Sequence, residues 1–249
     1  MIRAWCEGGI GRLALERPDK RNALTPPMLA QLQSEVATLS DRAGVIVLSG
    51  QGAAFCAGFD LALCREDETA LGSMLRGLGA AVGALRRSDA VIVVAAHGAA
   101  VAGGCALLGG GDIVVTDARA TLGYPVVRLG ISPAVSAPTL RLLVGDGAAR
   151  ERVLDPGLID GREAARLGLA HEVVEEPGEV LPRAMDLARE LAAKPRRGLM
   201  HTKRWLNRID GSGEAEALAP GLAASLALVG GPEQAELLPR AWARPARPS

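Results

Sequence analysis

Apolar residues along the chain follow two periods, which predict alternating strands and helices. Short apolar runs bounded by glycine, proline or charged residues predict strands, at Ile10–Glu16, Gly44–Gly50, Ala90–Ala96 and Asp112–Thr116. Apolar positions three and four residues apart predict helices, at Met28–Ser40, Thr69–Arg87, Gly103–Gly110, Ala137–Leu154, Gly161–Leu167, Val180–Ala193 and Leu199–Arg208. Strands that alternate with helices favour βαβ units and a mainly parallel sheet.

Composition limits the class of protein. The 249 residues are 49% hydrophobic, which is enough for a sizeable globular core. Basic and acidic residues balance at 28 each, so we expect no nucleic-acid partner. The weakly polar stretch 90–111 is too rich in glycine for a membrane helix, and residues 1–9 lack the apolar core of a signal peptide. The four cysteines form no CxxC pair, so we expect no metal site and a reducing cytoplasm.

Two glycine-containing segments follow predicted strands and are candidates for a ligand site. They are Phe55–Leu61 and His97–Cys105. Ligands gather at the carboxyl ends of parallel strands, and small residues let them approach the backbone. Gly103 and Gly104 at the start of a helix would present free N–H groups, and two amides aimed at one carbonyl oxygen form an oxyanion hole. Taken singly, each segment is more typical of a tight turn.

Five segments in a fixed order add to this picture, namely Leu15–Leu24, Gly50–Leu61, Gly98–Ile113, Leu129–Pro133 and Asp160–Val174. Together they resemble the motifs of the enoyl-CoA hydratase/isomerase family, the crotonases. The resemblance implies an α/β fold, a spiral of ββα units followed by a helical C-terminal region used for trimerisation. We therefore expect a core with the acyl-CoA site in residues 1–190 and a helical region in 191–249, with a frayed Pro/Arg-rich tail from Arg240.

The resemblance also implies a site. Crotonases bind acyl-CoA thioesters and hold the thioester enolate with two backbone amides, which here would belong to Phe59 and Gly103. Coenzyme A is part of the substrate, so no separate cofactor is implied, and the partner expected besides acyl-CoA is a second copy, in a trimer or hexamer. The residues implied in acyl-CoA binding are Lys20, Arg21, Ala23, Leu24, Ala57, Gly58, Asp60, Leu61, Gly104 and Lys203. Lys203 would approach the CoA phosphates, although a solvated helix face explains it equally well.

The chain departs from the family at the two positions that matter for hydration. Adding water to an enoyl thioester needs two acid/base groups, and hydratases of the family use two glutamates. Ala106 and Val126 stand at those positions, and neither side chain can transfer a proton. The residues thus argue against efficient hydration, and against an isomerase with its base near Val126. A dehalogenase would need an aspartate nucleophile within residues 134–136, where there is none.

Few side chains are available to replace the glutamates. Tyr124 is the only tyrosine and lies two residues before Val126; it can donate a hydrogen bond but is a poor base. Asp60 lies beside the expected oxyanion amide, although capping of the following helix is the more common role. We expect His97 to make a turn hydrogen bond and Cys105 to be a buried thiol.

Three functions remain open from the sequence. An acyl-CoA enzyme of different chemistry, a decarboxylase or a thioester hydrolase, could act from the oxyanion hole with few side-chain acids. Decarboxylation forms the enolate without proton abstraction, and Arg128 and Tyr124 are near in sequence to hold a carboxylated acyl group. A non-catalytic acyl-CoA binder would keep the fold without turnover. A weak enoyl-CoA hydratase of fatty-acid metabolism would use water or a displaced carboxylate such as Glu151 or Asp155.

Overall fold

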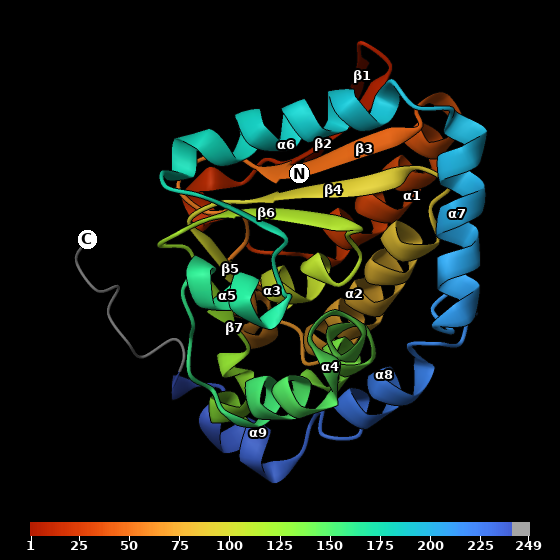
Figure 1. The fold of residues 1–249 in the computed structure, drawn as a ribbon. Helices are drawn as coiled ribbons and strands as arrows, with labels where there is room; N and C mark the ends of the chain where they lie inside the picture. The colour runs from red at the N-terminus through yellow and green to blue at the C-terminus, as the bar shows by residue number, and fades with distance from the viewer. Residues whose placement is uncertain (241–249) are drawn as a thin grey trace.

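A six-stranded sheet lies at the centre of the protein in the computed structural model, which describes residues 1–240 (Figure 1). Its strands, in spatial order, are β1 (Ile2–Glu7), β2 (Ile10–Leu15), β3 (Val45–Gly50), β4 (Val91–Ala96), β6 (Ile113–Asp117) and β8 (Glu172–Val174). β1 is antiparallel to β2, and every other pair is parallel. This confirms the predicted, mainly parallel sheet. β4 is buried at every position, as expected for a strand covered on both faces.

Helices cover both faces of the sheet. They are, in chain order, α1 (Pro26–Arg42), α2 (Ala70–Arg87), α3 (Gly103–Leu108), α4 (Ala137–Leu154), α5 (Gly161–Leu167), α6 (Pro177–Ala192), α7 (Arg196–Ile209), α8 (Ala219–Leu226) and α9 (Pro232–Leu237). α6 lies across one face (Figure 1), where Val180 and Ala184 pack among Val47 and Val93. The apolar stripes of α1, α2 and α3 bury the other face in the larger core.

A second, smaller layer of strands creates the ββα units that the resemblance implies. β5 (Ala99–Val101) pairs in parallel with β7 (Thr121–Gly123), and single bridges extend this layer through Cys56 to Ala100 and through Leu24 to Phe59. Thus β4, β5 and α3 follow one another as one ββα unit. The layer brings the two glycine-containing segments side by side.

Short 3-10 helices and a kink complete the part of the fold that frames the site. The 3-10 helices are η1 (Pro18–Lys20), η2 (Leu61–Arg65), η3 (Pro125–Leu129) and η4 (Pro133–Ser136). The predicted single helix at Ala137–Leu154 is interrupted at Gly145, whose φ of 76° and ψ of 167° are not helical. A residue with this backbone conformation breaks the helical hydrogen-bond ladder, so α4 consists of two segments.

The C-terminal helices run from the sheet to the opposite end of the molecule. α7 passes along one side and α8 and α9 lie below the core (Figure 1). α8 packs on η4 and α9 on η3, so this region of the same chain backs the 3-10 helices. Trimerisation through it stays a prediction, and the expected frayed tail falls largely on residues 241–249, outside the described residues. Within residues 1–240, no helix has both the length and the apolar character needed to cross a bilayer.

Candidate active site

A cavity of about 460 Å³ lies where the second strand layer, α2, η3 and η4 meet. Its size is typical of sites for small organic groups. Phe59 and Gly103, the residues expected to form the oxyanion hole, both line it. Most of the wall is apolar, and its larger side chains are Leu61, Leu75, Leu78, Val101, Val126, Leu129, Ile131 and Val135. The cavity is therefore a largely apolar chamber with two backbone segments at its edge.

The amide of Phe59 is left free by the way its segment pairs. Leu24 donates its N–H to the carbonyl of Gly58 at 2.7 Å and accepts the N–H of Asp60 at 2.9 Å. In such a parallel bridge the central residue, Phe59, turns its own N–H to the opposite side. Among the described residues no hydrogen-bond acceptor is found for this N–H. Since Phe59 lines the cavity, its amide is a candidate donor to a ligand oxygen.

The second amide belongs to Gly103, the first residue of α3, whose N–H has no acceptor within the helix. Two glycines explain how the segments come so close. A Cβ on Gly58, whose φ is +96°, would lie 3.5 Å from the nitrogen of Gly103. A Cβ on Gly104 would lie 2.2 Å from the carbonyl oxygen of Cys56, which only glycine avoids. The two amides therefore belong to backbone segments in direct contact.

Ala102, just before this helix, has an unusual backbone for a residue with a side chain. Its φ of 54° and ψ of −116° lie in a region that L-residues rarely adopt. The conformation is held by a hydrogen bond from its N–H to the carbonyl of Gly123 at 2.8 Å. Such strain costs about 1–3 kcal/mol and clusters at ligand sites.

Tyr124 lines the cavity as a protonated group. It is 3% exposed, and burial raises the pKa of its hydroxyl well above 10.0. Its hydroxyl is hydrogen-bonded to the thiol of Cys105, whose pKa burial raises to about 11. The predicted buried thiol is thus confirmed. Tyr124 can donate a hydrogen bond to a ligand but cannot act as a base near neutral pH.

No aspartate or glutamate side chain is among the residues that line this cavity in the described chain. Val126 lines it, whereas Ala106 is buried on α3 and is not among the lining residues. The two carboxylates considered as substitutes lie elsewhere. Glu151 and Asp155 are exposed and face Arg152, at 2.8 and 3.7 Å. The polar side chains on the wall are Arg21, Tyr124, Arg128, Ser132 and Ser136.

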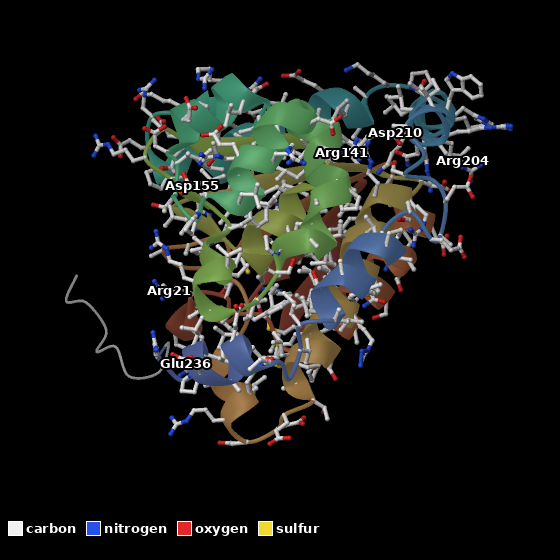
Figure 2. All side chains as sticks on the ribbon, turned by 90° about the horizontal axis from the view of Figure 1, so that it is seen from below. Arg21, Arg141, Asp155, Arg204, Asp210 and Glu236 are labelled. Carbon is white, nitrogen blue, oxygen red and sulfur yellow. The ribbon has the colours of Figure 1, made fainter. Side chains whose placement is uncertain are left out.

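The predicted role of Lys203 is wrong. Its side chain is 6% exposed, and its ammonium group donates to Asp112 Oδ2 at 2.7 Å, Ala90 O at 2.8 Å and Leu85 O at 3.3 Å. The next residue, Arg204, lies on the opposite side of the molecule from Arg21, which lines the cavity (Figure 2). Lys203 therefore ties α7 to Leu85, Ala90 and Asp112 and is not among the residues that line the cavity.

Asp60 also differs from its expected role. Its side chain makes no capping hydrogen bond to the helix that follows. It forms an ion pair with Arg17 instead, with 2.9 Å between Nη2 and Oδ2. His97 makes a long-range hydrogen bond rather than one within its own turn, because its Nε2 lies 2.8 Å from the carbonyl oxygen of Gly52, 45 residues earlier in the chain.

The remaining residues implied in acyl-CoA binding divide into two groups. Arg21, Ala57 and Leu61 line the cavity. The others do not line it, and these are Lys20, Ala23, Leu24, Gly58 and Gly104. Sequence reasoning missed Asn22, which is fully buried and has a φ of 56°. An asparagine between exposed Arg21 and buried Leu24 is a weak sign of such a buried turn.

The fold and the cavity define the class of protein. A spiral of ββα units with two free amides at the edge of an apolar cavity is the crotonase architecture. The model of the family described as enoyl-CoA hydratase/isomerase matches residues 6–219. The chain belongs to the enoyl-CoA hydratase/isomerase family.

Individual relatives support this assignment. A Thermus thermophilus protein is 35% identical over 215 residues, covering 83% of this chain and 84% of its own. A crotonyl-CoA hydratase of Syntrophomonas wolfei is 31% identical over 221 residues, covering 84% of each chain. Among solved structures, an enoyl-CoA hydratase/isomerase from Mycobacterium paratuberculosis superposes with a TM-score of 0.87 at 26% identity, covering 96% of this chain and 97% of its own.

Proposed function

We propose that the protein is an acyl-CoA enzyme that stabilises a thioester enolate between the amides of Phe59 and Gly103 and forms it without a side-chain base. The observation that carries this proposal is the cavity wall itself. It has two free backbone donors at one edge and no carboxylate among its described residues. Donors aimed at a developing oxyanion are often the largest single contribution to catalysis. The enolate-stabilising half of the chemistry is thus supported, and the proton-transfer half is not.

Hydration is the reaction that this wall disfavours. It requires one group to activate water and one to protonate the α-carbon. Val126 stands where one of these groups is expected, and Tyr124 stays protonated because burial raises its pKa. Thioester hydrolysis meets the same obstacle, because no base on the wall can activate water. The hydroxyl of Ser132 accepts the N–H of Ala134 at 3.2 Å, and neither Ser132 nor Ser136 faces a base on the wall.

Decarboxylation of a thioester with a carboxylate on its α-carbon avoids this obstacle. The bond between the α-carbon and the carboxylate breaks, its electron pair moves into the enolate, and carbon dioxide leaves. A proton from water then reaches the α-carbon, so no side-chain base is used. An apolar wall favours this step, because a poorly solvated carboxylate loses its charge while the new charge develops at the two amides. The Tyr124 hydroxyl and the Arg128 guanidinium are the polar groups available to orient such an acyl group.

The test is to incubate the protein with malonyl-CoA, methylmalonyl-CoA, crotonyl-CoA and butyryl-CoA in deuterium oxide and follow every species by mass spectrometry. We expect loss of carbon dioxide from the first two, with deuterium at the α-carbon, and no addition of water to crotonyl-CoA. Tyr124→Phe is the matched variant, because it removes only the hydroxyl, and its turnover should fall while butyryl-CoA binding stays. Rapid addition of water to crotonyl-CoA would refute the proposal.

The second candidate is a non-catalytic acyl-CoA binder. The same lack of carboxylates on the wall favours it, since binding needs only the cavity and the amides. It predicts that an acyl-CoA raises the melting temperature while no thioester in the panel changes and no deuterium enters the α-carbon. The deuterium label distinguishes the enzyme from the non-catalytic binder, because any enolate formed in deuterium oxide takes up deuterium at the α-carbon.

A further inference from the structure

The guanidinium of Arg17 joins the two chain segments that hold the Phe59 amide. Its Nη1 donates to the carbonyl of Ala23 at 2.6 Å, and its Nη2 donates to Asp60 Oδ2 at 2.9 Å. The side chains of Arg17 and Asp60 are 24% and 15% exposed, so the pair is largely shielded from solvent. Neither residue lines the cavity, and no step of the proposed reaction uses them.

The ion pair reinforces the hydrogen bonds around the oxyanion amide. Ala57 donates its N–H to the carbonyl of Arg21 at 2.9 Å, and Leu24 bonds on both sides of Phe59. Asp60 directly follows Phe59, so its carboxylate is anchored one residue beyond the amide. The Arg17 side chain thereby connects the carbonyl of Ala23 to this anchor. Rotation of the segment around Phe59 would have to break the charged hydrogen bond as well as the backbone bonds.

Arg17 is itself held by the buried side chain of Asn22. The N–H of Arg17 donates to Asn22 Oδ1 at 2.8 Å, and the N–H of Asn22 donates to the carbonyl of Arg17, also at 2.8 Å. The amide group of Asn22 donates to the carbonyls of Gln51 and Ala54, each at 2.8 Å. The backbone of Arg17 is therefore fixed through Asn22 to the loop after β3, and its guanidinium extends from there to Ala23 and Asp60.

We propose that the Arg17–Asp60 pair is a positioning device for the oxyanion hole that sets the direction of the Phe59 N–H. The proposal rests on the proposed function, because it needs the Phe59 amide to receive the thioester oxygen. A catalytic donor must be held within about 0.5 Å of its working position by groups behind it. Loss of the pair misaligns one donor without removing it. The expected fall in turnover is on the order of tenfold, below the 10²–10³ lost when a whole donor is removed.

The test uses a chromophoric probe, dimethylaminocinnamoyl-CoA, whose absorbance moves to longer wavelength when its thioester carbonyl accepts strong hydrogen bonds. The variants are Arg17→Met, Asp60→Asn and the double variant, with Arg17→Lys as the conservative substitution. We expect each single variant to lose part of the shift, because the Gly103 donor stays in place, while the dissociation constant of the probe changes little. The double variant should lose no more than a single one, because both residues act through one contact. Arg17→Lys should recover part of the shift.

Arg86→Met is the matched control. Arg86 makes an ion pair of similar burial with Asp210, at 2.7 Å and with side-chain exposures of 14% and 22%. Asp210 lies on the opposite side of the molecule from Arg21 (Figure 2). This control should keep the full shift.

The outcomes separate the two proposals. If the wild-type protein binds the probe without any shift, the oxyanion hole and the proposed function fail. If the wild type shifts the probe and Arg17→Met and Asp60→Asn shift it equally, only the positioning role is overturned. An equal loss of the shift in Arg86→Met would also overturn it, because the effect would then be one of general stability. Should Arg17→Met not fold, Asp60→Asn and Arg17→Lys carry the same comparison.

Discussion

Replacing Lys203 by methionine should destabilise the fold and leave acyl-CoA binding intact. The ammonium group donates to two carbonyl oxygens and to Asp112, within 2.7–3.3 Å, and its side chain is 6% exposed. Methionine fills a similar volume but donates nothing. Among the described residues, Asp112 Oδ2 would then retain only the N–H of Ile92, at 2.7 Å. The carbonyl oxygens of Leu85 and Ala90 would lose the same donor.

The expected loss of unfolding free energy follows from the burial of the Lys203–Asp112 pair. Removing one partner of a buried ion pair costs about 3–5 kcal/mol, because the other charge is left uncompensated. For a chain of this size each kcal/mol moves the melting temperature by about 2–4 °C, so the expected fall is roughly 6–20 °C. The double variant Lys203→Met with Asp112→Asn should be more stable than the single one, because it removes the uncompensated charge as well.

The pH dependence gives a second check with a definite sign. Desolvation lowers the pKa of Lys203 below 10.5, against the opposing attraction of Asp112. Between the lowered pKa and 10.5 the unfolded chain binds more protons than the folded one, so this group makes stability rise with pH in that window. The difference in unfolding free energy between wild type and Lys203→Met should therefore increase as the pH rises through the window.

The assay pairs urea unfolding with calorimetric titration of butyryl-CoA. Arg204→Met serves as the control, because Arg204 is the next residue on α7 and pairs with Asp89 at the surface. It should shift the urea midpoint far less than Lys203→Met. An unchanged midpoint for Lys203→Met together with a tenfold weaker butyryl-CoA complex would refute a structural role for Lys203. It would instead support the expected contact between Lys203 and the CoA phosphates.

Substitutions at Ala102 and Val126 and the reactivity of two buried cysteines can each be tested separately. Ala102→Gly should raise the urea midpoint, since relief of about 1–3 kcal/mol of strain exceeds the roughly 0.5–1 kcal/mol entropic cost of glycine; a lower midpoint would show that the backbone at φ 54° is not strained. Val126→Glu should speed crotonyl-CoA hydration by about 10²-fold, because it returns an acid/base group to the wall; an unchanged rate would place Val126 away from the reacting atoms. Burial raises the pKa of Cys56 to about 12 and of Cys105 to about 11, so a thiol reagent near neutral pH should modify these two only after unfolding.

The sheet and the main helices were predictable because their signals are local. β3 and β4 are apolar runs bounded by glycine or charge, and α5 coincides with its predicted range, Gly161–Leu167. β5 and β7 are three residues each, too short to show a period of two. Their pairing depends on the chain around them, so the second layer followed only from the family resemblance.

The site was predictable where the backbone determines it and not where side chains from distant parts of the chain do. Phe59 and Gly103 lie in segments marked by glycine after a strand, and both line the cavity. Lys203 looks the same in sequence whether its helix face is exposed or buried, and Asp112 lies 91 residues away. The prediction that Asp60 caps the following helix used only neighbouring residues, whereas its partner Arg17 is 43 residues distant in the chain.

In the proposed function, the chemistry depends on groups that a side-chain substitution does not easily remove. The proposed donors of Phe59 and Gly103 are backbone N–H groups, set by strand pairing and by the start of α3, whereas a single substitution removes an acid/base side chain. With Tyr124 neutral, the charged side chains on the described wall are Arg21 and Arg128, both exposed and cationic. A single carboxylate in this apolar chamber would have a raised pKa or pair with one of them. A wall with only cations is better matched to an acyl group that brings its own negative charge than to a neutral enoyl chain.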